Sequence, residues 1–231
     1  MRPTLLIADL HLSEQAPALD AAFTAFLAAA EAAGAEALYI LGDLFDYYLG
    51  DDLLTPYQAS VRARLEALPL PVYVLSGNRD FLLGPAFARG NIRLLPERFS
   101  PRPGVLLEHG DLLCSDDVGY QRLRWLLRRP VLQRLYFALP RAWKQRLAAR
   151  LRRSSRGKRC DRTDVNENTA EAAMRAAGAT VLIHGHTHRP GVHRNGQGER
   201  FVLGDWQPNG IVMLCYDWRQ FQLRDSADFI Q

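Results

Sequence analysis

The sequence predicts an α/β fold in which one layered domain spans residues 1–231. Short apolar runs alternate with longer runs of helical periodicity, a pattern typical of strands and helices that alternate along the chain. The length of 231 residues suits one well-buried domain with a small insertion. The composition, 48% hydrophobic and 23% charged, is that of a globular protein and excludes the disordered and fibrous classes.

The elements can be assigned in chain order from this alternation. Apolar runs bounded by polar or turn residues indicate strands, and longer runs with apolar residues at helical spacing indicate helices. Gly34 is a typical stop after the first helix. We expect strands at 4–8, 37–41, 71–75, 180–183, 200–203 and 210–216, and a further apolar run that ends at Leu107 before His109. Helices are expected at 19–33, 57–68 and 164–177.

Residues 119–159 interrupt the alternation and predict a helical insertion. Three short helices are expected there, at 121–129, 131–139 and 141–153. Pro130 and Pro140 fit the first turns of the second and third helices, where proline is tolerated. A polar linker at 154–158 follows. We predict that this insertion stands over the rim of the sheet.

Charge is strongly segregated along the chain. Residues 120–160 contain 14 Lys and Arg and no Asp or Glu, whereas the net charge of the whole chain is only +4. The remaining residues therefore carry a net charge of −10. Such a cationic segment indicates an anionic partner, which could be a membrane surface, a phosphorylated substrate or nucleic acid.

The sequence also indicates the cellular compartment of the protein. The chain has no apolar run of transmembrane length, and its N-terminal apolar run is too short for a secretory signal. Cys114, Cys160 and Cys215 are odd in number and lack the CxxC spacing of zinc ribbons. We expect reduced thiols in a cytoplasmic protein.

Polar residues with metal-binding side chains follow five of the apolar runs. Ligand sites of α/β folds lie beyond the carboxyl ends of strands, so these side chains are expected to meet in one place. Residues two apart in an extended segment point the same way, which would align Asp9 with His11 and His186 with His188. The predicted metal ligands are Asp9, His11, Asp43, Asn78, His109, His186 and His188.

This set contains nitrogen and oxygen ligands and no sulfur. It suits Mn²⁺, Fe²⁺ or Zn²⁺ better than Ca²⁺ or a thiolate site. Seven ligands exceed what one ion with an open position needs, but they fit two ions that share a bridging carboxylate such as Asp43. Two such ions can clamp a phosphoryl oxygen and activate water, so the sequence predicts phosphoester hydrolysis.

Five motifs resemble those of the calcineurin-like metallophosphoesterases. They are Asp9-x-His11, Gly42-Asp43, Gly77-Asn78, His109-Gly110 and Gly185-His186-Thr187-His188, in that order. The resemblance implies a four-layer β-sandwich flanked by helices. It also implies one ion held by Asp9, His11, Asp43 and His188, and a second held by Asp43, Asn78, His109 and His186.

One departure from the common family pattern points to a substrate. The residue after Gly-Asn is often His, but here it is Arg79, which cannot act as an acid near neutral pH yet can fork onto a phosphate. Gly77-Asn78-Arg79-Asp80 and the stretches 109–117, 183–190 and 203–206 are similar to the UDP-2,3-diacylglucosamine diphosphatase family of lipid A biosynthesis.

That resemblance implies hydrolysis of the pyrophosphate bond of UDP-2,3-diacylglucosamine to UMP and 2,3-diacylglucosamine 1-phosphate by metal-activated water. Two divalent ions per chain, commonly Mn²⁺, are implied. The catalytic residues would be Asp43, Asn78, Arg79 and His109. Substrate contacts would come from Asn78, Arg79, Asp117, Lys158 and His186, with Ser154 or Ser155 beside them.

The same resemblance implies that the insertion is a substrate lid. We expect peripheral association with the cytoplasmic face of the inner membrane, no nucleic acid and no obligate protein partner. Arg79 and Lys158 would contact the diphosphate, and Asp117 a sugar or nucleoside hydroxyl.

Several alternatives stay open at this stage. The chain could be a general dinuclear metallophosphoesterase for another phosphodiester or nucleotide, or a metal-binding membrane-docking module without turnover. The cationic helices could be an ordinary solvated face, Arg79 could merely neutralise a carboxylate, and Asp117 could form a turn. Asp80 and Asp111 are expected to support ligands, and His184 to be structural or to orient a ligand carboxylate.

Overall fold

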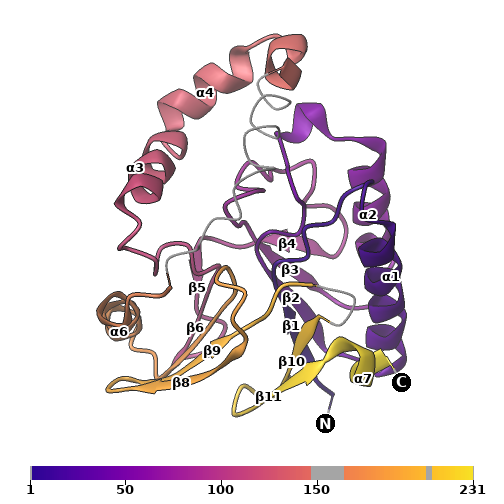
Figure 1. Ribbon diagram of the computed structural model, residues 1–231. Coiled ribbons are helices and arrows are strands. Elements are labelled where there is room, and N and C mark those ends of the chain that lie inside the picture. Colours follow the sequence, from indigo (N-terminus) through magenta and orange to yellow (C-terminus); the bar gives the residue numbers. More distant parts are fainter. Residues whose placement is uncertain (1, 147–163, 207–209, 231) are drawn as a thin grey trace.

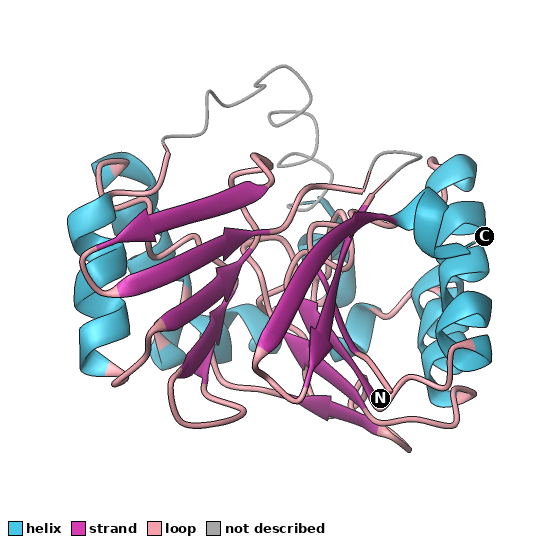
Figure 2. Ribbon diagram, turned by 90° about the horizontal axis from the view of Figure 1, so that it is seen from below, coloured by secondary structure: helices cyan, strands magenta, loops and turns pink. Residues whose placement is uncertain are grey.

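Two β-sheets form the centre of the protein, in a computed structural model that describes residues 2–146, 164–206 and 210–230. The first sheet has six strands in the order β11-β10-β1-β2-β3-β4, and the second has five in the order β5-β6-β7-β9-β8. Figure 2 shows the sheets side by side with helices on both outer surfaces. The predicted α/β sandwich of four layers is confirmed.

The first sheet is parallel at its centre. Strands β1 to β4 pair in parallel, and β10 and β11 extend the sheet antiparallel beyond β1. Helices alternate with the parallel strands, as the sequence predicts. The elements are β1 (Thr4–Ile7), α1 (Pro17–Ala32), β2 (Ala37–Leu41), η1 (Asp51–Leu53), α2 (Pro56–Glu66), β3 (Val72–Leu75), β4 (Ile92–Leu94), β10 (Ile211–Tyr216), β11 (Gln220–Asp225) and α7 (Ser226–Ile230).

The second sheet is built around the parallel strands β6, β7 and β9. Strands β5 and β8 pair antiparallel at its two edges. Helix α6 leads into β7. The elements are β5 (Arg98–Phe99), β6 (Val105–Glu108), α6 (Glu167–Ala176), β7 (Val181–His184), β8 (Gly191–Asn195) and β9 (Gly198–Val202).

Alternation along the strands separates the core into layers. In β1, Leu5 and Ile7 join the apolar cluster beneath α1 and α2, whereas Leu6 faces the second sheet. Leu182 of β7 faces outward and packs in a third cluster with Met174 of α6. The strands β1, β2, β3, β6 and β7 are covered on both faces and are nearly continuous apolar runs, which is why they are visible in the sequence.

Three helices carry the chain away from the sandwich, as Figure 1 shows. They are α3 (Val118–Leu127), α4 (Pro130–Ala138) and the helical residues 141–146. We refer to these residues, 118–146, as the lid helices. Neither α3 nor α4, both fully described, buries a residue. The rest of the predicted insertion, including the end of its third helix and the linker, lies outside the described residues.

The sequence analysis misplaced or missed the weaker elements. The helix expected from 164 begins only at Glu167, because the Asn166 side chain accepts a hydrogen bond from the Thr169 amide and caps it. Strands β4 and β5 are too short to show a periodicity, and edge strand β8 is largely exposed. These strands form because the neighbouring strand offers a hydrogen-bonding edge.

Candidate metal centre

The candidate ligands converge where strands of both sheets end. Asp9, Asp43 and Asn78 follow β1, β2 and β3, whose parallel pairing aligns their carboxyl ends. His109 follows β6, and His186 follows β7, its parallel neighbour in the second sheet. The predicted ligand rim therefore lies where the carboxyl ends of the strands of both sheets come together. Each sheet contributes candidate ligands to it.

The extended backbone expected for the paired ligands is wrong. Asp9 and His11 do not lie in an extended segment, since their φ angles are 54° and 48°. His186 and His188 are also left-handed, at 70° and 57°, and so is Asp43 at 52°. Five of the seven candidate ligands thus adopt a backbone that non-glycine residues rarely use, and which persists only where the surroundings enforce it.

Two groups of side chains have the spacing of a metal site. In the first, His188 Nε2 lies 3.2 Å from Asp9 Oδ1 and 3.3 Å from His11 Nε2. The second comprises Asp9, Asp43 and His109, with 3.7 Å between His109 Nε2 and Asp43 Oδ1. Within each group the ligand atoms lie within 4.8 Å of one another. Two adjoining groups of this kind provide for two ions.

Further contacts connect the remaining candidates to these groups. Asn78 Oδ1 lies 3.1 Å from His109 Nε2, and the His186 ring centroid is 5.0 Å from that of His109. Asp9 belongs to both groups, while Asp43 Oδ2 lies 3.9 Å from His11 Nδ1. Either carboxylate can therefore reach both ion positions.

Hydrogen bonds fix the direction of the ligand atoms. His109 Nδ1 lies 2.8 Å from the Leu41 carbonyl, so this nitrogen donates and Nε2 keeps its lone pair for a cation. The His186 amide donates to Asp9 Oδ2, and the Arg79 amide donates to Asp43 Oδ1. In both carboxylates the other oxygen is left to face the centre.

The electrostatics of the centre fit bound cations. Burial raises the pKa of Asp43 to about 7, although the nearby His109 opposes the rise. Burial also raises the pKa of Asp9, but its contact with His188 and the charge of His109 outweigh it, so that the net pKa is below the ordinary value. Asp43 Oδ2 is buried and accepts no hydrogen bond from the described residues. A cation at this oxygen would offset the cost of burying its charge.

Two motif glycines let the backbone approach the carboxylates. A Cβ atom on Gly77 would lie 2.2 Å from Asp43 Oδ1, and one on Gly185 would lie 2.3 Å from Asp9 Oδ2. Any side chain at these positions would displace a candidate ligand. The glycines before Asn78 and His186 are therefore required by packing around the centre.

Asp80 and Asp205 support the ligand loops. Asp80 is fully buried and accepts hydrogen bonds from the amides of Gly77 and Leu44, which ties together the loops after β2 and β3. Asp205 Oδ2 lies 3.4 Å from His188 Nδ1 and can orient that ring. Asp205 lies in the stretch 203–206 that carries the family resemblance, but its residue type alone predicts no role beside His188.

His184 has a structural environment. Burial, together with the positive charge of Arg200, lowers the pKa of His184 to about 3. Its Nδ1 lies 2.8 Å from the Gly185 carbonyl, and its Nε2 lies 3.2 Å from Arg200 Nη1. The neutral ring thus supports the backbone before His186, and these contacts do not orient a ligand carboxylate.

A cavity of about 400 Å³ lies between the lid helices and the rest of the chain, beside the centre. Asn78 and Arg79 line it, and most of the other lining side chains are apolar. Arg79 Nη1 lies 3.2 Å from Asp46 Oδ1, and its Nε is 4.0 Å from Asp43 Oδ2. The guanidinium therefore stands at the boundary between the candidate centre and the cavity.

Helix α3 is fastened to the same rim. Asp111 Oδ2 accepts hydrogen bonds from the Tyr120 hydroxyl and Arg124 Nε, each at 2.7 Å. Arg128 Nη2 donates to the carbonyl of Gly77 at 2.9 Å. Tyr120, Arg124 and Arg128 also line the cavity. Tyr120 follows the stretch 109–117 that carries the family resemblance, whereas Arg124 and Arg128 are not singled out by the sequence, which marks the cationic residues only as a set.

The structure describes only some of the remaining residues that are predicted to contact substrate. The Asp117 side chain accepts a hydrogen bond from the Tyr120 amide and caps α3, as the alternative of a turn residue would suggest. Its predicted contact with substrate stays a prediction. Ser154, Ser155 and Lys158 lie outside the described residues.

Comparison with known proteins agrees with this geometry. Residues 2–190 match the calcineurin-like phosphoesterase family. The chain is 43% identical to the UDP-2,3-diacylglucosamine hydrolase of Serratia proteamaculans and 46% identical to that of Escherichia fergusonii. Each comparison covers 91% of this chain and 93% of the relative.

Solved structures share the fold. A dimetal phosphatase from Danio rerio superposes with a TM-score of 0.57 at 15% identity, over 97% of this chain and 95% of its own. The protein TT1561 of Thermus thermophilus gives a TM-score of 0.52 at 13% identity, over 97% of this chain and 99% of its own.

Replacing Asp43 should reduce the bound metal. We expect Asp43→Ala to lower the affinity for Mn²⁺ by more than about 100-fold, because the variant loses a carboxylate that can reach both ion positions. Metal content after reconstitution and gel filtration measures this. Asp46→Ala, three residues further along the same loop, should keep the metal content of the unmodified chain. Full metal content in Asp43→Ala would contradict the assignment.

Replacing Asp205 should have a smaller effect on the same quantity. In Asp205→Asn the carboxylate that faces His188 Nδ1 is lost while its size is kept, so we expect a decrease in Mn²⁺ affinity of about 10-fold. Titration with Mn²⁺ followed by calorimetry gives the value. An unchanged affinity would show that His188 does not depend on Asp205.

Proposed function

Because the chain belongs to the calcineurin-like phosphoesterase family, we propose that it is a metal-dependent hydrolase of the pyrophosphate bond of UDP-2,3-diacylglucosamine. The products would be UMP and 2,3-diacylglucosamine 1-phosphate, in lipid A biosynthesis. The observation that carries the substrate is the identity of 43–46% with hydrolases named for it, over nearly the whole length of both chains. An apolar cavity beside a candidate metal centre is what a nucleotide-linked lipid requires.

The candidate centre would hold two divalent ions, for which we propose Mn²⁺. All seven candidate ligands offer nitrogen or oxygen, a set that suits Mn²⁺. When bound, such ions supply Lewis acidity and activate water for attack on phosphorus. The chain itself must hold the phosphate in line with that water, exclude competing water and neutralise the charge that develops.

We propose that Arg79 performs the last of these tasks. It lines the cavity and lies close to Asp43, so a diphosphate that bridges the centre and the cavity would pass its guanidinium. Arginine holds its proton near neutral pH and binds phosphate through two parallel N–H groups. That suits a reaction whose leaving group is itself a phosphate, because such a group needs charge neutralisation more than a proton.

Asn78 and His186 are further candidates for substrate contact, together with three predicted positions outside the described residues. Asn78 lines the cavity and also faces His109, so its amide could serve both an ion and a phosphate oxygen. Ser154 or Ser155 and Lys158 belong to the insertion that follows the lid helices, and we propose them as contacts on the basis of the motif match alone.

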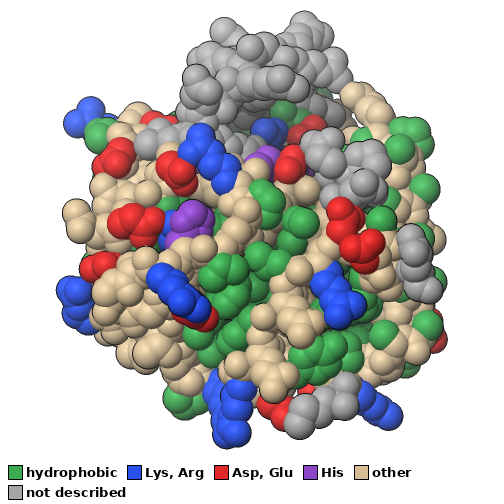
Figure 3. All heavy atoms as spheres, turned by 60° about the horizontal axis from the view of Figure 1, so that its bottom comes forward, with side chains coloured by type: hydrophobic (Ala, Val, Ile, Leu, Met, Phe, Trp, Pro, Cys, Tyr) green, Lys and Arg blue, Asp and Glu red, His purple; other side chains and the backbone are tan. Residues whose placement is uncertain are grey.

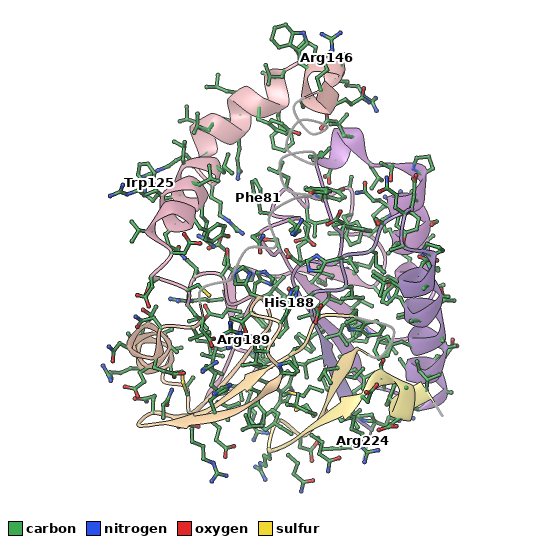
Figure 4. All side chains as sticks on the ribbon, in the orientation of Figure 1. Phe81, Trp125, Arg146, His188, Arg189 and Arg224 are labelled. Atoms are coloured by element: carbon green, nitrogen blue, oxygen red, sulfur yellow. The ribbon has the colours of Figure 1, made fainter. Side chains whose placement is uncertain are left out.

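One acyl chain of the substrate would enter the cavity. Its volume of about 400 Å³ lies within the range of sites for small organic ligands. Phe81, Leu82, Leu123, Leu127 and Leu132 form much of its wall. In Figure 4 Phe81 lies between α3 and the body of the protein, on the inner side of the lid helices.

The outer side of the lid helices is suited to a membrane surface, and we propose that the chain associates peripherally with the cytoplasmic face of the inner membrane. Trp125 and Trp143 are 60% and 63% exposed, and Val131 and Leu135 are exposed as well. Trp125 points away from the body of the protein in Figure 4. Arg129 lies 3.6 Å from the Trp125 ring centroid, which places a cation beside an aromatic ring as at a lipid interface.

Charge supports the same surface. Residues 120–160 carry 14 cationic and no acidic side chains, which would attract anionic headgroups. The face of the sandwich shown in Figure 3 instead presents Lys and Arg singly, with Asp and Glu among them. No helix in the described part of the chain has the length and apolarity needed to cross a bilayer.

The activity is tested by UMP release from UDP-2,3-diacylglucosamine with Mn²⁺ present, alongside cyclic nucleotides and DNA. We expect UMP from the lipid substrate only. Arg79→Ala should lower kcat about 100-fold through lost charge stabilisation, and Arg79→Lys should recover part of it. Arg224→Ala, exposed on β11 and remote from the centre in Figure 4, is the matched control. Turnover of DNA or cyclic nucleotides without UMP release would favour the general phosphoesterase.

Membrane association is tested by sedimentation with vesicles. We expect binding to vesicles of phosphatidylcholine with phosphatidylglycerol, and a loss of roughly 10-fold in Trp125→Ser with Trp143→Ser, because two exposed apolar anchors are removed. Val192→Ser replaces an exposed apolar residue of β8 and should bind like the unmodified chain. Equal binding by the double variant would exclude this surface.

A further inference from the structure

Lys144 occupies an unusual position for a lysine. It is 2% exposed, although the other residues of 141–146 are exposed. Its side chain lines the cavity, where its Nζ lies 5.6 Å from the Tyr136 ring centroid. A buried ammonium needs a partner, and Nζ finds one in the Asp52 carboxylate of η1. It also donates to the Phe137 carbonyl at 3.3 Å.

Lys144 marks the end of the cavity that lies away from the candidate metal centre. Residues 141–146 form the tip of the lid helices, as the positions of Arg146 and His188 in Figure 4 show. The cavity lining runs from Asn78 and Arg79, beside the centre, to Lys144. Nearby, the Tyr136 hydroxyl donates to the Leu49 carbonyl at 2.8 Å and fastens α4 to the loop before η1.

An ammonium in this position sets a limit on an apolar ligand. A hydrocarbon chain that passed Lys144 would separate it from Asp52 and leave a buried charge without its partner, which is strongly unfavourable. Asp52 is partly exposed, so its carboxylate also meets water at this end of the cavity. An acyl chain that ends before the Lys144–Asp52 ion pair stays buried and leaves the salt bridge intact.

We propose that Lys144, held by Asp52, determines the greatest acyl-chain length that the enzyme accepts. The inference rests on the proposed function and concerns one of the two acyl chains. At about 30 Å³ for each heavy atom, a cavity of about 400 Å³ has room for about 13 such atoms. This is one chain of roughly a dozen carbons, with its carboxyl end toward Arg79 and its methyl end against Lys144.

The experiment measures kcat/KM for UMP release with a series of UDP-diacylglucosamines whose acyl chains lengthen by two methylene groups at each step. Lys144→Ala removes four heavy atoms and the charge, so the preferred chain should lengthen by about two to four methylene groups. For the longest chains kcat/KM should rise roughly 10-fold over the unmodified chain. Arg146→Ala removes a cation from the same helical turn and should leave the preference unchanged.

Asp52→Ala provides a second, independent variant. This variant keeps Lys144 but frees its ammonium to turn outward, so the preferred acyl chain should again lengthen. If Lys144→Ala does not fold, Asp52→Ala alone tests the inference. The inference would be overturned if folded Lys144→Ala and Asp52→Ala showed the same acyl-length preference as the unmodified protein. Failure of the unmodified chain to release UMP at any chain length would instead overturn the proposed function.

Discussion

The burial of Asp9 and Asp43 side by side is the constraint on which the rest of the site depends. Two carboxylates fully removed from water repel one another, and their charge must be balanced within a few ångströms. Imidazoles from both sheets surround them, and backbone amides hold one oxygen of each. The left-handed ligand residues and the glycines at 77 and 185 are consequences of bringing so many groups to one point.

Ligand identity was predictable because it depends on residue type and on strand ends. Asp9, Asp43 and Asn78 follow buried apolar runs, and parallel pairing brings such ends together. The backbone that aims the ligands was not predictable, since the left-handed angles of Asp9 and His11 arise from tertiary contacts that no local pattern encodes. Asp205 escaped assignment for a similar reason, because its relation to His188 depends on how the chain packs after β9.

The periodicity of apolar residues in the sequence predicted less about the helices around the cavity. The helices of the insertion were predicted near their observed positions, because proline and apolar spacing mark their ends. The face that each helix turns inward was not predictable from the sequence. Both α3 and α4 expose apolar side chains on their outer side, and they line the cavity with other apolar side chains on their inner side. A buried lysine such as Lys144 cannot be told from its solvated neighbours by sequence, because burial of a charge depends on a partner 92 residues away.

The attachment of the lid helices at both ends has a consequence for local stability. Near the candidate metal centre the helices contact Asp111 and the Gly77 carbonyl. At the tip they contact the Leu49 carbonyl and Asp52. Since α3 and α4 bury no residue, ionic and hydrogen-bonding contacts rather than a core keep them in place. We therefore expect the amide hydrogens of α3 and α4 to exchange through local opening faster than those of the sandwich.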